Sequence, residues 1–217
     1  MPTSRARPRD KITQGESTAL NLGKQPAASQ GLSYEDLYQL EQKRRLLSDA
    51  LLEVAATVGR SLDLREVFGL IRAQLEKVFL FHQASITLLE GDRLTLAAQW
   101  REDGELETPY TIPVDRFPLN AAVLRERKVL VTQDVRADHR WRETHHSRGT
   151  RSFINAPLMV GNQIIGLLGI GRADDTSYTE EDAQMVQAFA TQVAIAIQNA
   201  RLVEETQRAL RETEGLF

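Results

Sequence analysis

The 217-residue chain contains no cysteine. Disulfides, thiolate metal ligands, cysteine nucleophiles and a thioether-linked chromophore are therefore all excluded. The formal net charge of −3 is too small to draw the whole molecule onto nucleic acid or an anionic membrane. No apolar run approaches the roughly 20 residues of a bilayer-spanning helix, and the first residues lack the apolar stretch of a secretory signal. These absences predict a cytoplasmic protein.

The motifs of several enzyme classes are also missing. The chain has no G-x-S-x-G turn for a serine nucleophile, no phosphate-binding P-loop and no H-E-x-x-H zinc motif. Gly166, Gly169 and Gly171 punctuate one predicted strand, and they indicate close backbone packing because no helix follows them directly. We therefore expect no catalytic machinery and no metal site in this chain.

Four segments differ in composition and periodicity. Residues 1–31 mix proline, glycine and polar residues without an apolar period, which is typical of a disordered leader. Residues 32–60 predict a coiled-coil or linker helix, and residues 61–178 predict a globular core. Residues 179–217 begin with the capping sequence Thr-Glu-Glu-Asp and predict a single helix roughly 55 Å long that continues as a coiled coil.

The first and last helical segments carry apolar residues at alternating spacings of three and four, which is typical of coiled coils. The distal half of the last helix has no globular sequence left to pack on, so we expect it to pair with a second chain. A helix lying on a sheet shows similar spacings, and the pairing direction stays open. The predicted dimer interface comprises Leu37, Leu40, Leu47, Leu51, Val54, Val186, Phe189, Val193, Ala200, Val203 and Leu210.

The core region predicts one helix after Asp63, a short helix at 119–127 and six strands. The expected strands are 84–89, 94–100, 110–114, 129–135, 152–160 and 163–173. The dipeptide Gly161-Asn162 predicts a tight hairpin between the last two. Leu94, Leu96, Ala98 and Trp100 alternate with polar or small residues, so we expect them on one buried face.

Four short segments resemble motifs of the GAF domain family. They are 132–141, which ends in a D-x-R-W turn, 149–158 with its G-x-R-S start, 164–168 with its I-G-L pattern, and 177–182 with an aromatic residue before a helix cap. The resemblance covers about residues 46–200. It implies an α+β fold in which a central antiparallel sheet packs its helices on one face. On the other face it implies a ligand pocket, roofed by segments around Phe117 and residues 141–150.

The candidate pocket residues carry an aromatic ring, a charge or a small polar group. They are Trp100, Phe117, Trp141, His145, His146, Arg148, Ser152 and Asn155. Aromatic rings suit an apolar pocket wall, although each ring also fits ordinary core packing. Ser152 and Asn155 fall on opposite faces by the strand period of two, so at most one of them faces the pocket.

The connection at residues 136–150, called the roof loop below, is rich in arginine and histidine. Its arginines suit an anionic ligand such as a phosphate or carboxylate, or they form a solvated positive patch. Some family members hold haem in this pocket, and His139, His145 or His146 would then supply an axial ligand. The same histidines also fit a solvent-facing loop. Family members that attach a bilin or reduce methionine sulfoxide use cysteines, which this chain lacks, and the asparagine-lysine motif of cyclic-nucleotide binders is not apparent.

The sequence thus predicts a sensory or regulatory module of a signal-transduction protein. It would bind an unidentified small molecule and relay through a homodimeric coiled coil to an output domain, such as a histidine kinase or nucleotide cyclase, in cis or in trans. Two alternatives remain: a dimerisation scaffold that binds no ligand, and a haem-based redox or gas sensor.

Overall fold

The structure is a computed structural model, and it describes residues 64–101, 104–105, 110–144 and 147–214, with isolated residues between 38 and 49. The predicted leader and most of the first predicted helix lie outside this part of the chain. The expected site and interface residues that also lie outside it are Leu37, Leu40, Leu47, Leu51, Val54, His145 and His146.

The described strands form one antiparallel sheet in the order β3-β2-β1-β7-β6-β5, with β4 also paired to β2. The strands are β1 Gln83–Glu90, β2 Arg93–Arg101, β3 Gly104–Glu105, β4 Thr111–Pro113, β5 Leu130–Thr132, β6 Ser152–Val160 and β7 Gln163–Arg172. Gly161 adopts φ +57° in the turn between β6 and β7, which is the conformation a tight hairpin requires. The predicted strand at 129–135 is shortened to β5, because a turn begins at Asp134.

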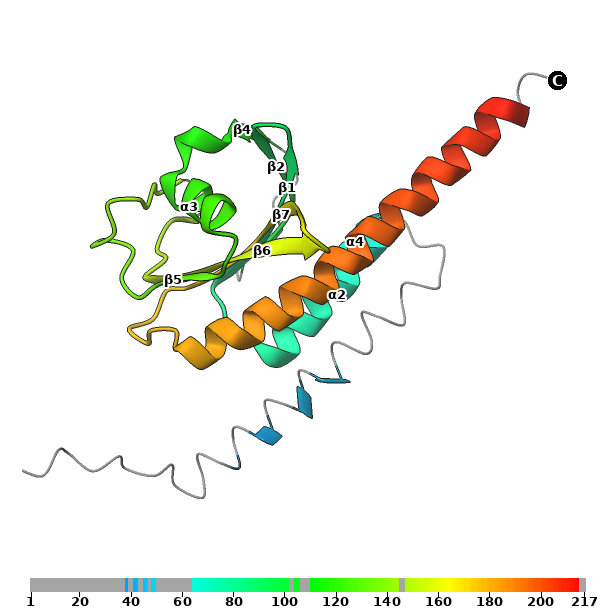
Figure 1. Ribbon diagram of the computed structural model, residues 1–217. Coiled ribbons are helices and arrows are strands. Elements are labelled where there is room, and N and C mark those ends of the chain that lie inside the picture. Colours follow the sequence, from blue (N-terminus) through cyan, green and yellow to red (C-terminus); the bar gives the residue numbers. More distant parts are fainter. Residues whose placement is uncertain are drawn as a thin grey trace, which may run out of the picture.

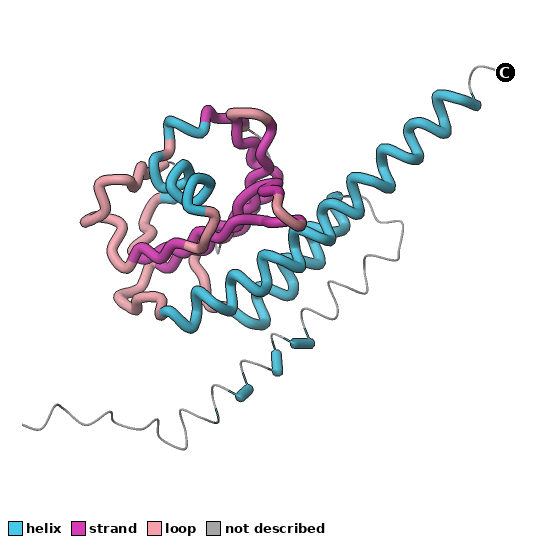
Figure 2. Tube along the Cα trace, viewed as in Figure 1, coloured by secondary structure: helices cyan, strands magenta, loops and turns pink. Residues whose placement is uncertain are grey.

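Helices cover the two faces of this sheet unequally (Figures 1 and 2). Helix α2 (Leu64–Val78) and helix α4 (Glu180–Glu214) lie side by side on one face. The 3-10 turn η1 (Val114–Arg116), helix α3 (Pro118–Glu126) and the roof loop lie on the other face. The expected α+β architecture is therefore present, with the helical layer on one side and a thinner cover on the other.

The main hydrophobic core lies between the sheet and helices α2 and α4. Ile154, Ala156 and Leu158 alternate along β6 and are fully buried beneath α4. Phe79 meets Phe189 of α4 edge to face, with ring centroids 6.0 Å apart. Burying a side chain of this size contributes about 1.5–3 kcal/mol relative to leaving it in water, so this layer holds the two helices against the sheet.

Helix α4 corrects the prediction that its whole apolar pattern forms a dimer interface. Val186, Phe189 and Val193 have no exposed surface and Ala200 has 6%, because they pack on the chain's own sheet. The buried stripe also includes Ala190 and further small residues, so it is wider than a heptad pattern. A partner chain cannot reach these four predicted interface residues.

The far end of α4 differs from its beginning. Val203 is half-buried and residues 204–212 are exposed, with Leu210 at 56%. Figure 1 shows this end of the helix running past the sheet into open space. The Glu204 carboxylate accepts the backbone amide of Leu64 at the start of α2, at 3.3 Å, and this contact marks where the packed part of α4 ends.

A bulge in β2 changes which side chains face the helices. Ile86 of β1 pairs with Ala98 and the next residue, Thr87, pairs with Leu96, so Ala97 is an extra residue without a partner. An extra residue turns all later side chains to the opposite face. The predicted common face of Leu94 to Trp100 is therefore wrong: Leu96 faces away from α2 and α4, whereas Trp100 lies in the core beneath them.

A capping box begins helix α4. The Thr179 hydroxyl accepts the Asp182 amide at 3.1 Å, and the Asp182 carboxylate accepts the Thr179 amide at 2.9 Å. This reciprocal pair was expected from the Thr-x-x-Asp pattern. None of the described helices combines the length and apolar character of a membrane-crossing segment.

Candidate ligand-binding site

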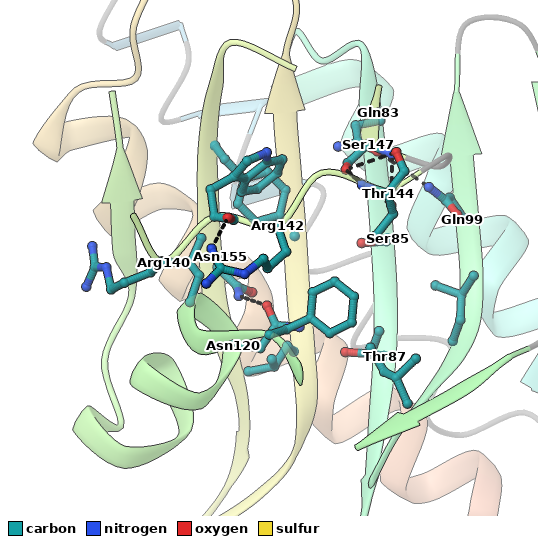
Figure 3. A pocket seen from close by; sticks show the side chains of 18 of the residues that line it. Gln83, Ser85, Thr87, Gln99, Asn120, Arg140, Arg142, Thr144, Ser147 and Asn155 are labelled. Carbon is teal, nitrogen blue, oxygen red and sulfur yellow. Dashed lines mark hydrogen bonds between the residues drawn. The ribbon is translucent and has the colours of Figure 1, made fainter. Parts of the chain in front are cut away.

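A cavity that is partly open to solvent lies on the sheet face opposite α2 and α4. Strands β1, β6 and β7 form its floor, β2 and β4 one wall, and α3 with the roof loop its cover (Figure 3). The residues that line it are Gln83, Ser85, Thr87, Leu96, Gln99, Tyr110, Ile112, Phe117, Leu119, Asn120, Arg140, Trp141, Arg142, Thr144, Ser147, Phe153, Asn155, Leu167 and Gly169.

Polar side chains follow one face of the central strand β1. Gln83, Ser85 and Thr87 occupy alternate positions and point into the cavity, whereas Ala84 and Ile86 between them face the core. Gln83 donates its side-chain amide to the Thr150 hydroxyl at 2.8 Å. The floor of the cavity is therefore a row of hydrogen-bonding groups on a strand buried in the middle of the sheet.

The bulge in β2 adds a fourth polar group to this row. It turns Gln99 toward the cavity, where its amide donates to the Gln83 side-chain oxygen at 3.4 Å. Without the extra residue Ala97, Gln99 would face the helices and Trp100 would face the cavity. The bulge thus places the polar end of β2 beside the polar row of β1.

Two aromatic rings close one side of the cavity. Trp141 of the roof loop meets Phe153 of β6 edge to face, with ring centroids 5.0 Å apart. The Phe153 ring has room because residue 169 on the neighbouring strand is glycine: a Cβ there would lie 2.6 Å from the Phe153 ring and 3.1 Å from the Ser85 hydroxyl. Gly169 therefore leaves the space that the Phe153 ring occupies over the floor.

Helix α3 is tied to the floor by an amide pair. Asn155 of β6 donates to the side-chain oxygen of Asn120 at 2.9 Å, and both residues line the cavity. At the other end of α3, Arg127 adopts the left-handed conformation and donates to the Asn162 carbonyl at 2.6 Å. The helix that covers the cavity is thus fixed to the β6–β7 hairpin at two places.

Two successive Asp-x-Arg turns shape the chain from β5 into the roof loop. Asp138 accepts the Arg140 amide at 2.9 Å and its guanidinium at 2.8 Å, and Asp134 makes the same contacts with Arg136 at 3.0 and 2.8 Å. The hydrogen bonds from the Arg140 side chain lower the pKa of Asp138 to about 2. Asp138 therefore remains a carboxylate at neutral pH and holds its turn by charge as well as by geometry.

The two roof arginines that line the cavity point in different directions. Arg140 turns outward, where both oxygens of Asp138 accept from its guanidinium. Arg142 turns inward over the cavity, and its Nη1 donates to the carbonyls of His139 and Trp141, each at 2.8 Å (Figure 3). The inward guanidinium is thus held in place by main-chain acceptors rather than by a carboxylate.

The structure brings three of the expected pocket residues together: Phe117, Trp141 and Asn155 all line the cavity. Trp100 lies in the core instead, and Ser152 donates to the Thr176 carbonyl on the opposite side of β6, as the period of two requires. Arg148 is exposed in a turn and is not among the lining residues. The structure therefore does not place Trp100, Ser152 or Arg148 in the pocket, contrary to the expectation from sequence.

Sequence reasoning missed the polar row itself. The signal was present, because Gln83, Ser85 and Thr87 alternate with apolar residues in a strand that lies between two others. Alternation in a central strand, covered on both faces, indicates a polar cavity rather than solvent. Asn120 and Gln99 had no comparable signal, since their placement depends on α3 docking and on the bulge.

The described part of the chain places no histidine at the cavity and no cluster of metal-ligating side chains. None of the described lining residues is a histidine, and His139 is exposed outside the cavity. The described residues also contain no group of three or more histidine, aspartate or glutamate side chains suited to a metal ion. A neutral-to-cationic lining of amides, hydroxyls and aromatic rings instead suits an organic ligand.

Comparisons with known proteins agree with this architecture. A sequence model of the GAF domain matches residues 63–197. Among solved structures, free methionine-R-sulfoxide reductase from Neisseria meningitidis matches with TM-score 0.61 at 22% identity, over 76% of this chain and 93% of that one. The GAF domain of a two-component sensor histidine kinase from Bacillus halodurans matches with TM-score 0.54 at 20% identity, over 64% and 97%.

A third match is the GAF domain of a phosphoenolpyruvate-protein phosphotransferase from Coxiella burnetii, with TM-score 0.61 at 14% identity, over 73% of this chain and 96% of that one. The fold thus occurs both in an enzyme and in domains of signalling proteins. At these identities the likeness shows the fold and assigns no activity. Thiol chemistry is closed to this chain, because it has no cysteine.

Proposed function

This chain belongs to the GAF domain family, and from that we propose that it is a sensory module that binds a small organic molecule beneath the roof loop. Domains of this family occur in sensory and regulatory proteins. The observation that carries the proposal is the polar row of β1, which lies beneath α3 and the roof loop rather than in open solvent. An unpaired polar group in a closed core costs about 1–3 kcal/mol, so such a row suits a cavity that receives a ligand.

Strand β6 provides the route from the cavity to the helical layer. Phe153 and Asn155 face the cavity, whereas Ile154 and Ala156 between them pack under α4. The Gln187 side chain of α4 also donates to the Pro157 carbonyl at 3.4 Å. A ligand that shifts β6 would also shift the surface on which α4 packs. It can do so only if it binds the shifted and unshifted arrangements of β6 and α4 with different affinity.

The output of this route is the distal end of α4. We propose that this end pairs with the same helix of a second chain as a coiled coil, together with the predicted helix at residues 32–60. Leu202 and Leu210 are 49% and 56% exposed on this end of the helix, and a pairing there would bury their apolar surface. The relay would then reach an output domain, such as a histidine kinase, in cis or in trans.

The test is native mass spectrometry of the purified chain, with an absorption spectrum of the same sample. The proposal expects a dimer that carries, or takes up from a metabolite extract, a stoichiometric extra mass. The variant Ser85→Leu fills the cavity and should lose that mass. Thr111→Leu, an exposed β4 residue outside the lining, should retain it. A mass that survives Ser85→Leu would place the ligand elsewhere.

A dimerisation scaffold is the second candidate, favoured by the same exposed leucines on α4. It expects a dimer without added mass in every extract, and a dimer equally stable in wild type and Ser85→Leu. The absorption spectrum addresses the haem sensor on the same sample. A Soret band would support it, with His145 or His146 as the histidines to substitute.

A further inference from the structure

We infer that the ligand of this cavity is a small carboxylate whose oxyanion is held by Arg142, and that it bears a hydroxyl or oxo group rather than an ammonium group. The inference rests on the proposed ligand-binding function of the same cavity. Four features carry it: the free edge of the Arg142 guanidinium, the absence of acidic side chains among the described lining residues, the hydroxyls of β1 and the aromatic side.

The guanidinium of Arg142 is held by hydrogen bonds that involve only one of its three nitrogens. Both N–H bonds of its Nη1 group donate to the carbonyls of His139 and Trp141. The edge formed by Nε and Nη2 makes none of the hydrogen bonds found among the described residues, and Arg142 is one of the residues that line the cavity (Figure 3). Two parallel N–H donors on one rigid edge match the two oxygens of a carboxylate.

No described carboxylate neutralises this charge. Arg140 is paired with Asp138, and Glu143 beside Arg142 accepts the backbone amide of Gly149 at 3.4 Å. None of the described residues that line the cavity is an aspartate or a glutamate. Among the described lining residues, the positive charge of Arg142 is therefore not balanced by a carboxylate, which favours an anion and disfavours an ammonium group that would need an acidic partner.

The floor offers neutral hydrogen-bonding groups. Ser85 and Thr87 present hydroxyls, each able to donate and accept, at alternate positions of β1. The amides of Gln83 and Gln99 are already engaged in the chain that ends on Thr150. A ligand hydroxyl or carbonyl thus finds a partner on the floor, and an apolar substituent finds the rings of Trp141 and Phe153.

The inference is tested with probes of one shape and different charge. One series is L-lactate, lactamide and alanine, and the larger series is 3-phenyllactate, 3-phenyllactamide and phenylalanine. Affinities for the full chain come from NMR titration of the tryptophan indole signals, and Trp141→Phe identifies the signal that reports the cavity. The anion should bind about tenfold or more tightly than its amide, with the amino acid no tighter than the amide.

Variants assign that preference to one residue. Arg142→Gln should remove the preference for the anion over the amide. Arg148→Gln, an exposed roof arginine outside the lining, should keep the preference. Far-ultraviolet circular dichroism and melting temperature show that both variants are folded.

Each of the other possible results contradicts a different part of the inference. Equal binding of anion and amide, or a preference that survives Arg142→Gln, overturns the role of Arg142 while the cavity remains a ligand site. Tighter binding of the amino acid overturns the exclusion of an ammonium group. Binding of no probe in either series, with Ser85→Leu also unaltered in its ligand content, overturns the proposed function and this inference together.

Discussion

Two carboxylates with the same contacts differ in their surroundings. Asp134 and Asp138 each bind the guanidinium and the amide of the arginine two residues later. The Asp138 side chain is 12% exposed and the Asp134 side chain 43%. Solvent screens an exposed pair more strongly. We therefore expect the Asp138–Arg140 ion pair to stabilise its turn more than the Asp134–Arg136 pair stabilises the turn before it.

Substituting Asp138→Asn should lower the free energy of unfolding by about 1–2 kcal/mol at pH 7. The folded-state pKa of Asp138, about 2, lies below its usual value. The stabilisation is therefore complete above about pH 4 and is lost as the pH falls toward 2. Urea unfolding at pH 7, 5 and 3 measures the difference from wild type, which should narrow at the lowest pH.

Asp134→Asn is the matched control for that substitution. It removes the same contacts from an exposed pair and should cost measurably less at pH 7. Equal losses for the two variants, or an Asp138→Asn deficit that stays constant down to pH 3, would show that the roof turn does not depend on its ionised carboxylate.

Gly169 is the residue on which the shape of the cavity depends most directly. In Gly169→Ala the new methyl group meets the Phe153 ring, which must swing into the cavity because the sheet lies beneath it. We expect loss of ligand binding and a cost of about 1–3 kcal/mol in stability from overpacking. Titration of a cavity ligand and urea unfolding measure the two effects.

Gly69→Ala serves as the control for the added methyl group. Gly69 is exposed in α2 with no atom near the position of a Cβ, so alanine should stabilise the helix by up to about 1 kcal/mol and leave ligand binding unchanged. A Gly169→Ala variant that binds as well as this control would mean that the Phe153 ring does not border the ligand.

The strands could be predicted from the sequence where the local residue pattern agrees with the strand pairing in the sheet. The Gly161-Asn162 dipeptide predicted a tight hairpin between β6 and β7, and the structure contains it. The bulge at Ala97 was not predictable, because it is defined by pairing with β1 rather than by β2 itself. Because of this one-residue shift in pairing, Trp100 lies in the core rather than in the expected pocket.

Helix α4 shows a second limit of sequence reasoning. Spacings of three and four occur both in a coiled coil and in a helix packed on a sheet. The alanines of its first half allow close approach to β6, and this tertiary fit decided between the two. Which roof arginine faces inward depended similarly on a pairing, because Asp138 draws Arg140 outward and leaves Arg142 over the cavity.

The capping box predicts the behaviour of α4 as an element. Thr179→Ala removes the acceptor of the Asp182 amide and should lower the free energy of unfolding by about 1 kcal/mol. Thr206→Ala, at an exposed interior position where the hydroxyl bonds the Leu202 carbonyl, should change stability by less than about 0.5 kcal/mol. Urea unfolding compares the two, and similar losses would argue against the cap.

At the scale of the whole molecule, the free end of α4 predicts an association. Val203→Ser combined with Leu210→Ser should raise the dimer dissociation constant by about tenfold or more, since both residues lie on one side of the helix beyond the sheet. Sedimentation equilibrium of the full chain measures this constant. Glu205→Ser, on the opposite side of the helix, should leave it unchanged.

The same experiment can contradict the pairing. A wild-type chain that is monomeric at all concentrations, or a dimer that the double substitution does not weaken, would remove the proposed coiled coil. Ligand binding in the double variant should remain at the wild-type level, because the cavity lies on the other face of the sheet.

The bulge in β2 has a consequence for the evolution of this domain. On one side of Ala97, Leu96 lines the cavity, and on the other side Trp100 fills the core. Related chains that have diverged toward new ligands should therefore vary at position 96 and at Gln99 while they conserve volume at position 100. The extra residue puts positions 96 and 100, which a regular strand would place on one face, under separate selection for recognition and for stability.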